Sequence, residues 1–267
     1  MESVSDLKDL YQNDFDTESF FQYYYNPNSE EYTKNPSCTF AIENLHKTFS
    51  SGEVKGDLLI DIGSGPCIHT IVSACECFKE IIASDWTDAN RRAYERWLRN
   101  EPGAFDWTPV VSMVCELEGD RTKCAEKEKK IRATVKQVLK CDVTKNNPLN
   151  PIVLPPADCL VTSLCLESAS NDLKSYTEAL RNITTLLKTG GHLVMIAVTG
   201  STSYKVGQKL FPDLNLNEEF IKSTIKGNGY VIKEMKICPI ARNANPDCAN
   251  GDHVVNYVFL LAQKIYN

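Results

Sequence analysis

The chain alternates short apolar runs with segments of helical periodicity, a pattern typical of an α/β fold. The predicted strands span residues 58–62, 81–85, 135–143, 157–166, 192–198, 231–238 and 254–262. The first strand is apolar over residues 58–60 without alternation, as expected of a strand covered on both faces. A polar loop over residues 239–253, with no helix, separates the last two strands. The pattern therefore predicts a seven-stranded, mostly parallel sheet with helices on both faces.

Helices are expected in most of the intervals between these strands. They are predicted at residues 38–49, 67–79, 88–101, 124–132, 172–187 and 218–226. Residues 110–114 fit a strand or a helix, and residues 200–212 are predicted to form a polar loop. Residues 104–133 are interpreted as an insertion between the second and third strands. No repeat and no linker divides the chain, so residues 1–267 are predicted to form a single domain.

The first 50 residues contain a dense aromatic cluster. Its members are Tyr11, Phe15, Phe20, Phe21, Tyr23, Tyr24, Tyr25 and Tyr32. One interpretation is that helices use these rings only to pack onto the domain. The other is a lid whose rings close a pocket and shield a cation.

A glycine turn ends the first predicted strand. Gly63 and Gly65 permit a tight turn and close approach of the backbone to a ligand, and a helix over 67–79 would direct free N–H groups at it. Asp85 ends the second strand. In nucleotide-binding α/β folds an acid at this position accepts hydrogen bonds from the hydroxyls of the ribose. A third glycine of the dinucleotide fingerprint is missing, and Asp61 suits a ligand with a positive amino group. These features favour S-adenosylmethionine over a dinucleotide.

Two further acids lie near the carboxyl ends of predicted strands. Asp142 can accept a hydrogen bond from an adenine amino group while the N–H of Val143 donates to a ring nitrogen. Glu167 directly follows the fourth strand, at the edge where open α/β sheets bind ligands. Asp142 could instead be an exposed strand-end aspartate, and Glu167 a buried structural carboxylate.

Composition narrows the class of protein. The formal net charge of −6 argues against a broad basic face for nucleic acid. The eleven cysteines are interpreted as buried free thiols, since none has convincing metal-ligand spacing. The N-terminal residues do not resemble a signal peptide and no apolar run could span a membrane. We therefore expect a cytoplasmic, monomeric protein without a metal site.

Four strings resemble a family of small-molecule amine methyltransferases that includes nicotinamide, indolethylamine and phenylethanolamine N-methyltransferases. They are GDLLIDIGSGP at 56–66, EPGAFDW at 101–107, VLKCDV at 138–143 and LLKTGGHL at 186–193. The resemblance covers nearly the whole chain. It implies a class I methyltransferase fold that binds S-adenosylmethionine, without metal, beneath an N-terminal aromatic lid.

The resemblance also implies roles for individual residues. The implied cofactor-binding residues are Tyr25, Gly63, Ser64, His69, Asp85, Asn90, Asp142, Val143 and Ser163. The implied substrate-binding residues are Phe20, Tyr24, Ala197, Tyr204, Asp213 and Asp252. Glu167 matches a glutamate that handles the substrate amine in the phenylethanolamine enzyme.

Several positions depart from the nicotinamide enzyme. Phe20 and His69 stand where that enzyme has tyrosines, and Ser163 replaces a threonine. Ala197 and Asp213 stand where it has an aspartate and a serine, and both of those positions bear on nicotinamide itself. Strings at 44–49 and 206–207 look more like the indolethylamine enzyme, and those at 165–167 and 183–187 like the phenylethanolamine enzyme.

The predicted reaction is N-methylation of a small-molecule amine, in the manner of the indolethylamine enzyme. An alkyl amine is protonated at neutral pH, and Glu167 could take that proton. A pyridine such as nicotinamide, or a thioether, would need no base, and Glu167 would then only orient the acceptor. The sequence leaves open two further classes of protein, namely a non-catalytic paralogue that binds the cofactor and a dinucleotide oxidoreductase.

Overall fold

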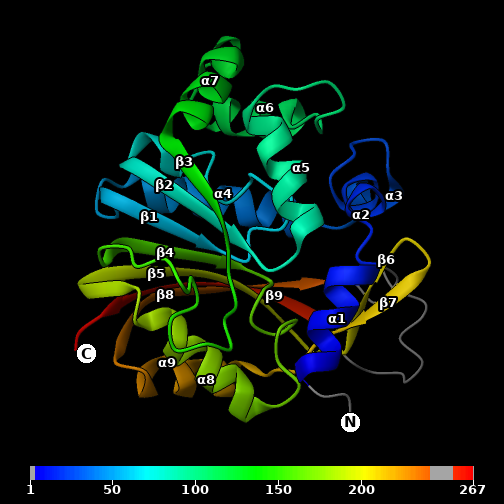
Figure 1. Ribbon diagram of the computed structural model, residues 1–267. Coiled ribbons are helices and arrows are strands. Elements are labelled where there is room, and N and C mark those ends of the chain that lie inside the picture. Colours follow the sequence, from blue (N-terminus) through cyan, green and yellow to red (C-terminus); the bar gives the residue numbers. More distant parts are fainter. Residues whose placement is uncertain (1–3, 241–254, 267) are drawn as a thin grey trace.

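The structure is a computed structural model that describes residues 4–240 and 255–266. Its main sheet has seven strands in the order β3-β2-β1-β4-β5-β9-β8 (Figure 1). The strands are β1 (Gly56–Ile62), β2 (Phe78–Asp85), β3 (Val135–Lys140), β4 (Ala157–Ser163), β5 (Leu187–Thr199), β8 (Tyr230–Ile240) and β9 (Val255–Lys264). The pairs from β3 to β5 are parallel, and β9 is antiparallel to both of its neighbours. The predicted sheet is therefore confirmed.

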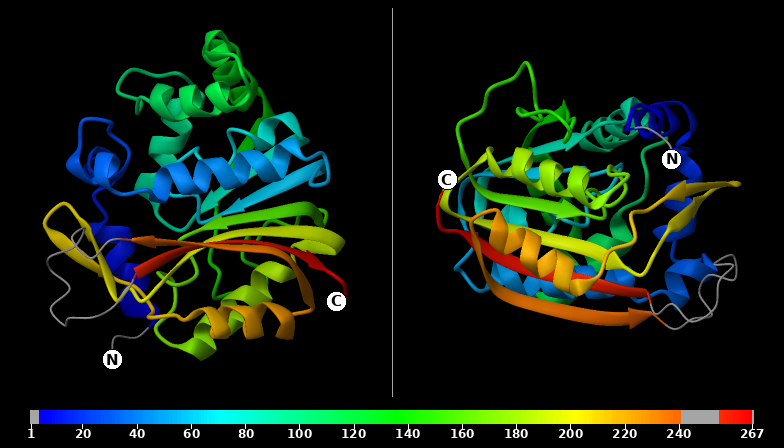
Figure 2. Two further views of the ribbon diagram at one scale, coloured as in Figure 1. Left: turned by 180° about the vertical axis from the view of Figure 1, so that it is seen from behind. Right: turned by 90° about the horizontal axis from the view of Figure 1, so that it is seen from below.

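Helices cover both faces of this sheet (Figures 1 and 2). They are α1 (Val4–Asp14), α2 (Thr17–Tyr24), α3 (Glu30–Lys34), α4 (Ser37–Ser50), α5 (Asp88–Leu98), α6 (Thr108–Leu117), α7 (Cys124–Thr134), α8 (Leu173–Thr184) and α9 (Glu218–Gly227). One hydrophobic core involves α4 to α7, and a second involves α8 and α9. Leu59 packs in the first core and its neighbours Leu58 and Ile60 in the second. Successive strand residues point to opposite faces, which is why β1 is apolar without alternation.

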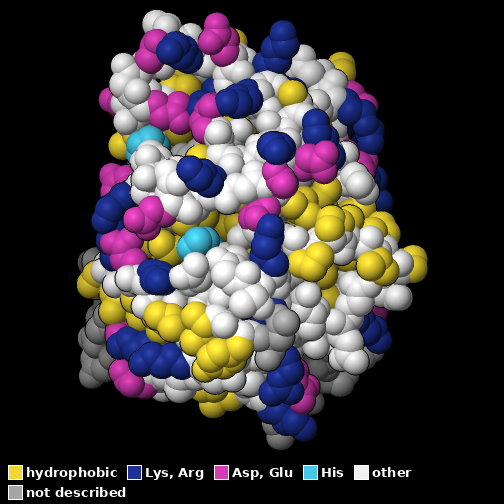
Figure 3. Space-filling view, turned by 90° about the vertical axis from the view of Figure 1, so that its left-hand side faces the viewer, with side chains coloured by type: hydrophobic (Ala, Val, Ile, Leu, Met, Phe, Trp, Pro, Cys, Tyr) yellow, Lys and Arg dark blue, Asp and Glu magenta, His cyan; other side chains and the backbone are white. Residues whose placement is uncertain are grey.

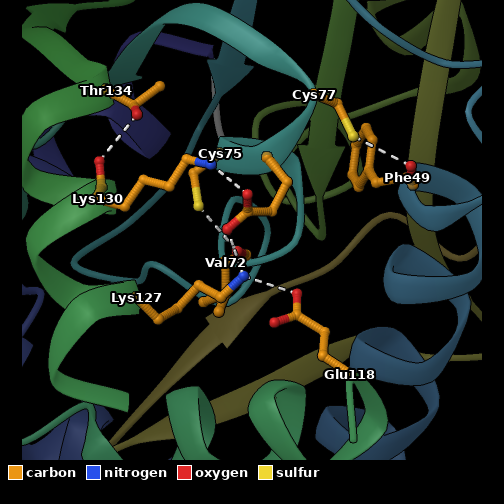
Figure 4. Close-up of polar contacts among 9 residues, drawn as sticks. Phe49, Val72, Cys75, Cys77, Glu118, Lys127, Lys130 and Thr134 are labelled. Atoms are coloured by element: carbon orange, nitrogen blue, oxygen red, sulfur yellow. Dashed lines mark hydrogen bonds and ion pairs between the residues drawn. The ribbon is translucent and has the colours of Figure 1, made fainter. Parts of the chain in front are cut away.

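The region predicted as an insertion, residues 104–133, is helical and contains α6 and α7. Residues 110–114, which fitted a strand or a helix, lie within α6. Lys127 of α7 places its ammonium 2.6 Å from Glu76 Oε1 and 2.7 Å from Glu118 Oε1 (Figure 4). Glu76 lies in the 3-10 helix η1 (Ala74–Glu76), directly before β2. The ion cluster thus ties α7 to the main body of the domain.

The predicted helix over residues 67–79 is wrong. The chain instead makes hydrogen-bonded turns that lead into η1, and β2 already begins at Phe78. The segment is rich in β-branched residues of low helix propensity, and its members Ile68, Thr70, Ile71 and Val72 are buried. Core packing therefore fixes an irregular path. Within residues 67–77 no α-helix presents its N-terminus to the glycine turn.

Residues 200–212, predicted as a loop, contain a hairpin of β6 (Ser203–Val206) and β7 (Lys209–Pro212). Gly207 opens its two-residue turn with a φ of 60°, a conformation that favours glycine. Each strand is too short to show a clear sequence period. Lys209 of the hairpin pairs with Asp14 of α1 at 2.6 Å, so the two elements lie together (Figure 1).

Some boundaries also differ from the prediction. Helix α8 ends at Thr184, three residues before the predicted end, and β5 already begins at Leu187. Strands β3 and β4 each end three residues before the predicted position. Asp142 and Glu167 consequently lie in loops just beyond the sheet edge.

The surface view in Figure 3 shows Lys and Arg side chains interspersed with Asp and Glu. That face of the molecule therefore offers no broad basic surface for nucleic acid. Among the described helices, none has both the length and the apolar character that crossing a membrane requires.

Candidate active site

A cavity of about 720 Å³ opens at the carboxyl ends of the parallel strands. Most of its lining comes from α1, α2, α4, the loops after β1 to β5 and the β6–β7 hairpin. All nine predicted cofactor residues line it, as do Phe20, Tyr24, Tyr204 and Asp213 from the predicted substrate set. The topology thus brings together side chains that lie far apart in the sequence.

The glycine turn leaves the backbone exposed to this cavity. Gly63 and Gly65 have φ values of 67° and 61°, in the left-handed region that favours glycine. A Cβ on Gly63 would lie 2.2 Å from Cys165 Sγ, so a side chain could not be accommodated there. The N–H of Gly65 donates to Asp85 Oδ2 at 2.9 Å and thereby fixes the turn against β2.

Asp85 ends β2 and is buried, at 7% exposure. Its Oδ1 accepts hydrogen bonds from the N–H of Thr87 at 2.8 Å and from Asn90 Nδ2 at 3.2 Å. Burial raises the pKa of Asp85, and these hydrogen bonds offset part of that rise. Thr17 of α2 donates to Asn90 Oδ1 at 2.9 Å, which connects α2 to this carboxylate.

Asp142 lies beyond β3, beside the buried Val143. Its carboxylate accepts hydrogen bonds from Lys8 Nζ at 2.7 Å and from Thr144 Oγ1 at 2.6 Å. Burial alone would raise the pKa of Asp142, but the bonds from Lys8 and Thr144 outweigh it and hold the pKa below its usual value. The carboxylate is therefore charged at neutral pH and can accept further bonds.

A row of three polar side chains crosses the cavity near β4. Tyr25, which follows α2, places its hydroxyl 3.3 Å from His69 Nδ1, and His69 Nε2 lies 3.4 Å from Ser163 Oγ. Burial lowers the pKa of His69 to about 4, so the ring is neutral at physiological pH. In either tautomer of a neutral imidazole one nitrogen donates and the other accepts, so the ring can satisfy both neighbours.

Aromatic side chains form another wall of the cavity. The ring centroids of Phe20 and Tyr24 are 5.1 Å apart, and Tyr24 donates its hydroxyl hydrogen to the carbonyl of Lys205 at 3.1 Å. Tyr11 of α1 and Tyr204 of β6 join their hydroxyls at 2.7 Å. These contacts hold α1 and α2 against the hairpin across the cavity.

Asp213 brings a carboxylate to this aromatic wall. Ser168 Oγ donates to its Oδ1 at 2.8 Å and Ser201 Oγ to its Oδ2 at 3.1 Å. Burial raises the pKa of Asp213, and the two hydroxyl groups only partly offset the rise. Within the described residues no Lys or Arg forms an ion pair with it. The cavity therefore contains a carboxylate partnered by neutral groups.

Three of the residues singled out in the sequence, Ala197, Glu167 and Asp61, are described and do not line the cavity. Ala197 is fully buried and packs in the second core, because its side chain points away from the cavity face of β5. Glu167 is 2% exposed, and its Oε1 accepts the N–H of Val198 at 2.9 Å. Asp61 is buried and accepts a hydrogen bond from Thr70. Asp252 lies outside the described residues.

Several residues around the cavity were missed. Lys8 of α1 donates to the predicted cofactor acid Asp142, Thr17 of α2 donates to the predicted cofactor residue Asn90, and Ser168 and Ser201 donate to Asp213. Lysine, threonine and serine in polar surroundings give no sequence signal of such contacts. Tyr11 was recognised only as one member of the aromatic cluster. In the described part of the chain, His, Cys, Asp and Glu side chains nowhere gather into a group that could hold a metal ion.

Comparison with known proteins connects this geometry to a family. A sequence profile of the NNMT/PNMT/TEMT family matches residues 4–265. The chain is 45% identical over 258 residues to the nicotinamide N-methyltransferase of Sus scrofa, with 97% of each chain covered. It is 43% identical over 256 residues to the indolethylamine N-methyltransferase of Oryctolagus cuniculus, covering 96% of this chain and 95% of that one.

A solved structure confirms the fold. The magnesium protoporphyrin IX methyltransferase of Synechocystis PCC 6803, solved with bound SAM, aligns with a TM-score of 0.61 at 8% identity. The alignment covers 99% of this chain and 98% of that one. The class I methyltransferase fold predicted from the sequence is therefore correct, and the predicted cofactor is the one bound in that structure. On the profile match and the identities together, this chain belongs to the NNMT/PNMT/TEMT family.

Proposed function

We propose that this protein transfers a methyl group from S-adenosylmethionine to the nitrogen of a small-molecule amine. Family membership supports the reaction class, since the named relatives are N-methyltransferases. The single observation that carries the choice of acceptor is Asp213, a cavity carboxylate that has only hydroxyl partners among the described residues.

The order of the strands in the sheet matches the order of the chemical groups along the cofactor. Strands β3, β2, β1 and β4 are neighbours, so Asp142, Asp85, Gly63 and Ser163 follow one another along the sheet edge. Asp142 would hold the adenine amino group and Asp85 the ribose hydroxyls, while the glycine turn would lie against the amino-acid portion. When bound, S-adenosylmethionine supplies an electrophilic methyl group on a sulfonium.

The acceptor is expected in the other part of the cavity, between the aromatic wall and Asp213. An ammonium there would neutralise the buried carboxylate, and faces of Tyr11, Tyr24 and Tyr204 would tolerate the cation. Asp213 can also accept the proton that an alkyl amine must lose before its nitrogen attacks. Glu167, the predicted base, does not line the cavity, so the geometry favours Asp213 for this role.

The lid, defined as α1 and α2, would exclude water from the transferred methyl group. Three hydrogen bonds join the lid to the rest of the cavity wall. Lys8 donates to Asp142, Thr17 donates to Asn90, and the hydroxyls of Tyr11 and Tyr204 are bonded to each other. We restrict the lid to α1 and α2 because they supply these contacts; α2, through Phe21, also packs in the first hydrophobic core, as α4 does.

A kinetic comparison tests the proposal. At fixed cofactor, kcat/KM for tryptamine or phenylethylamine is expected to exceed that for nicotinamide. Asp213→Asn should lower kcat/KM for the amines roughly 10- to 100-fold, because a charged hydrogen-bond partner is worth about 1.5–3 kcal/mol. The value for a pyridine should change less than about threefold, since a pyridine needs no proton acceptor. The control is Asp14→Asn, which removes a carboxylate of α1 that does not line the cavity.

Nicotinamide, or another pyridine, is the second candidate acceptor, and the 45% identity to a nicotinamide N-methyltransferase favours it. Nicotinamide exceeding every tested amine tenfold in kcat/KM would establish this candidate and refute the role given to Asp213. If no amine, pyridine or thioether were methylated although S-adenosylmethionine bound, the protein would be a non-catalytic member of the family.

A further inference from the structure

His69 is a buried, neutral imidazole inside the cofactor part of the cavity. It is 7% exposed and lines the cavity together with Tyr25 and Ser163. Its contacts to these two side chains measure 3.3 and 3.4 Å, longer than the usual 2.7–3.2 Å for such bonds. Both bonds are therefore weak, and a charged ligand atom that makes a shorter bond could displace either one.

The neighbours of His69 leave it without a charged partner. Tyr25 approaches from the end of α2, and the thiol of Cys67 lies beside the Tyr25 hydroxyl. Burial raises the pKa values of both groups, so each is neutral at physiological pH. Ser163 approaches from β4 and does not titrate. Burial is the only cause of the lowered pKa of His69, which means that no described carboxylate or cation acts on it.

The position of His69 relative to the strand ends indicates which group of the ligand it faces. If adenine lies at Asp142 beyond β3 and ribose at Asp85 beyond β2, the remaining amino-acid portion of the cofactor continues toward β1 and β4. Ser163 ends β4, and His69 is hydrogen-bonded to it. The α-carboxylate lies at the end of the cofactor opposite adenine, so it would reach the row formed by Tyr25, His69 and Ser163.

We infer that His69 binds the α-carboxylate of the cofactor and takes up a proton from solvent as it does so. The inference rests on the proposed function. An anion brought next to a buried imidazole stabilises the imidazolium and supplies the partner that the free protein lacks. No covalent bond changes: one solvent proton joins one ring nitrogen, and the resulting ion pair is electrically neutral.

Linkage gives the direction of the pH effect. In the free protein the pKa of His69 is about 4, and beside a carboxylate it is higher. Between these two pKa values the complex holds one more proton than the free protein. Affinity for the cofactor therefore falls as pH rises, by up to about tenfold per pH unit, and becomes constant above the pKa of the complex.

The test is calorimetric titration at pH 6 and pH 8, in two buffers that differ in ionisation enthalpy. The probes are S-adenosylhomocysteine, which has the α-carboxylate, and 5′-methylthioadenosine, which lacks the amino acid. At pH 6, S-adenosylhomocysteine should bind with uptake of about one proton, and methylthioadenosine with little or none. The variant His69→Tyr keeps a hydroxyl for the carboxylate, so it should bind S-adenosylhomocysteine without this uptake. The control His192→Gln removes a half-buried histidine of β5 outside the cavity and should retain it.

Equal proton uptake with both probes, or equal uptake in wild type and His69→Tyr, would overturn the inference. So would binding of S-adenosylhomocysteine to wild type without uptake at pH 6. If His69→Tyr does not fold, the ¹⁵N chemical shifts of the wild-type His69 ring test the inference instead. At pH 6 they should change from values typical of a neutral imidazole to values typical of an imidazolium when S-adenosylhomocysteine is added. Failure of wild type to bind either probe would instead contradict the proposed function.

Discussion

Lys8 of α1 donates a hydrogen bond to Asp142 at 2.7 Å, joining the lid to the acid assigned to adenine. The side chains are 24% and 15% exposed, so the pair is largely protected from solvent. Lys8 also donates to Thr144 Oγ1 at 2.7 Å, and its carbonyl accepts a hydrogen bond from Trp86 Nε1 at 3.0 Å. One residue of the lid therefore contacts the loops after both β2 and β3.

We expect Lys8→Met to weaken binding of S-adenosylmethionine about fivefold. A partly buried ion pair contributes roughly 1 kcal/mol, and its loss would leave the lid less firmly closed over the adenine. Calorimetry gives the affinity, and hydrogen exchange of α1 reports the lid. Lys209→Met is the matched control, because its partner Asp14 lies outside the cavity, and it should change affinity less than twofold. Tighter binding by Lys8→Met would show that Lys8 competes with the cofactor for Asp142.

Asp85→Asn should weaken cofactor binding roughly 10- to 100-fold. The charge that would bind the ribose is lost, and the single amide oxygen can replace only one of the two acceptors that the N–H groups of Gly65 and Thr87 use, at a cost of about 1.5–3 kcal/mol. The control Asp88→Asn makes the same exchange on α5, at a residue that pairs with Arg91 and does not line the cavity. Unchanged affinity in a folded Asp85→Asn variant would refute the ribose assignment.

Glu167 should make stability depend on pH. Burial chiefly, with the nearby charge of Asp213, raises its pKa from 4.5 to about 8 in the folded protein. Between those values the folded state retains a proton that the unfolded state has lost. Glu167 therefore lowers stability as pH rises from about 4.5 to 8, by up to ~1.4 kcal/mol per pH unit, and has no further effect above that range.

The variant Glu167→Gln isolates this contribution, since the amide can still accept the Val198 N–H. The Tm of Glu167→Gln minus the Tm of wild type should increase as pH is raised from 5 to 8. Asp61, whose pKa burial raises to about 7, adds a similar dependence to both proteins and cancels in the difference. A Tm difference that stays constant with pH would mean that Glu167 is ionised in the folded protein.

The ion cluster on α7 should contribute to stability and not to binding. Lys127→Met would leave Glu76 and Glu118 without their buried cation and should lower the free energy of unfolding by about 1–3 kcal/mol. Lys130→Met is the control, because Lys130 also pairs with Glu76 but its side chain is 46% exposed. Chemical denaturation measures the loss, and cofactor affinity of the folded variant should stay within twofold.

Turnover is expected to persist in excess EDTA. Methyl transfer from a sulfonium needs no Lewis acid, and the sequence contains no convincing set of metal ligands. The measurement is initial velocity in metal-free buffer with and without the chelator. Loss of activity that a single divalent ion restores would contradict this expectation.

Much of this protein is determined by its sequence alone. The strand order in the chain, the glycine turn and Asp85 require only local signals: apolar runs, a residue that tolerates positive φ, and an acid at a strand end. The family resemblance rests on strings such as GDLLIDIGSGP, and the profile match bears it out. Seven of the nine cofactor positions came from that resemblance as expected residues, and the other two, His69 and Ser163, as departures from it.

The errors have a common physical cause. Residues 67–79 form turns because burial of Ile68, Ile71 and Val72 in the first core determines the path, and periodicity does not report that packing. Glu167 was placed in the site by its position after a predicted strand and Ala197 by the family resemblance, but neither side chain lines the cavity.

Only the tertiary structure could bring Asp213 together with Ser168 and Ser201, or Lys8 with Asp142. Such contacts join segments up to 134 positions apart in the chain. They depend on the crossing of α1 over the sheet edge and on the hairpin beside it, neither of which leaves a periodic trace. The sequence thus determined the scaffold and the cofactor class, and the fold decided that Asp213, and not Glu167, lines the cavity.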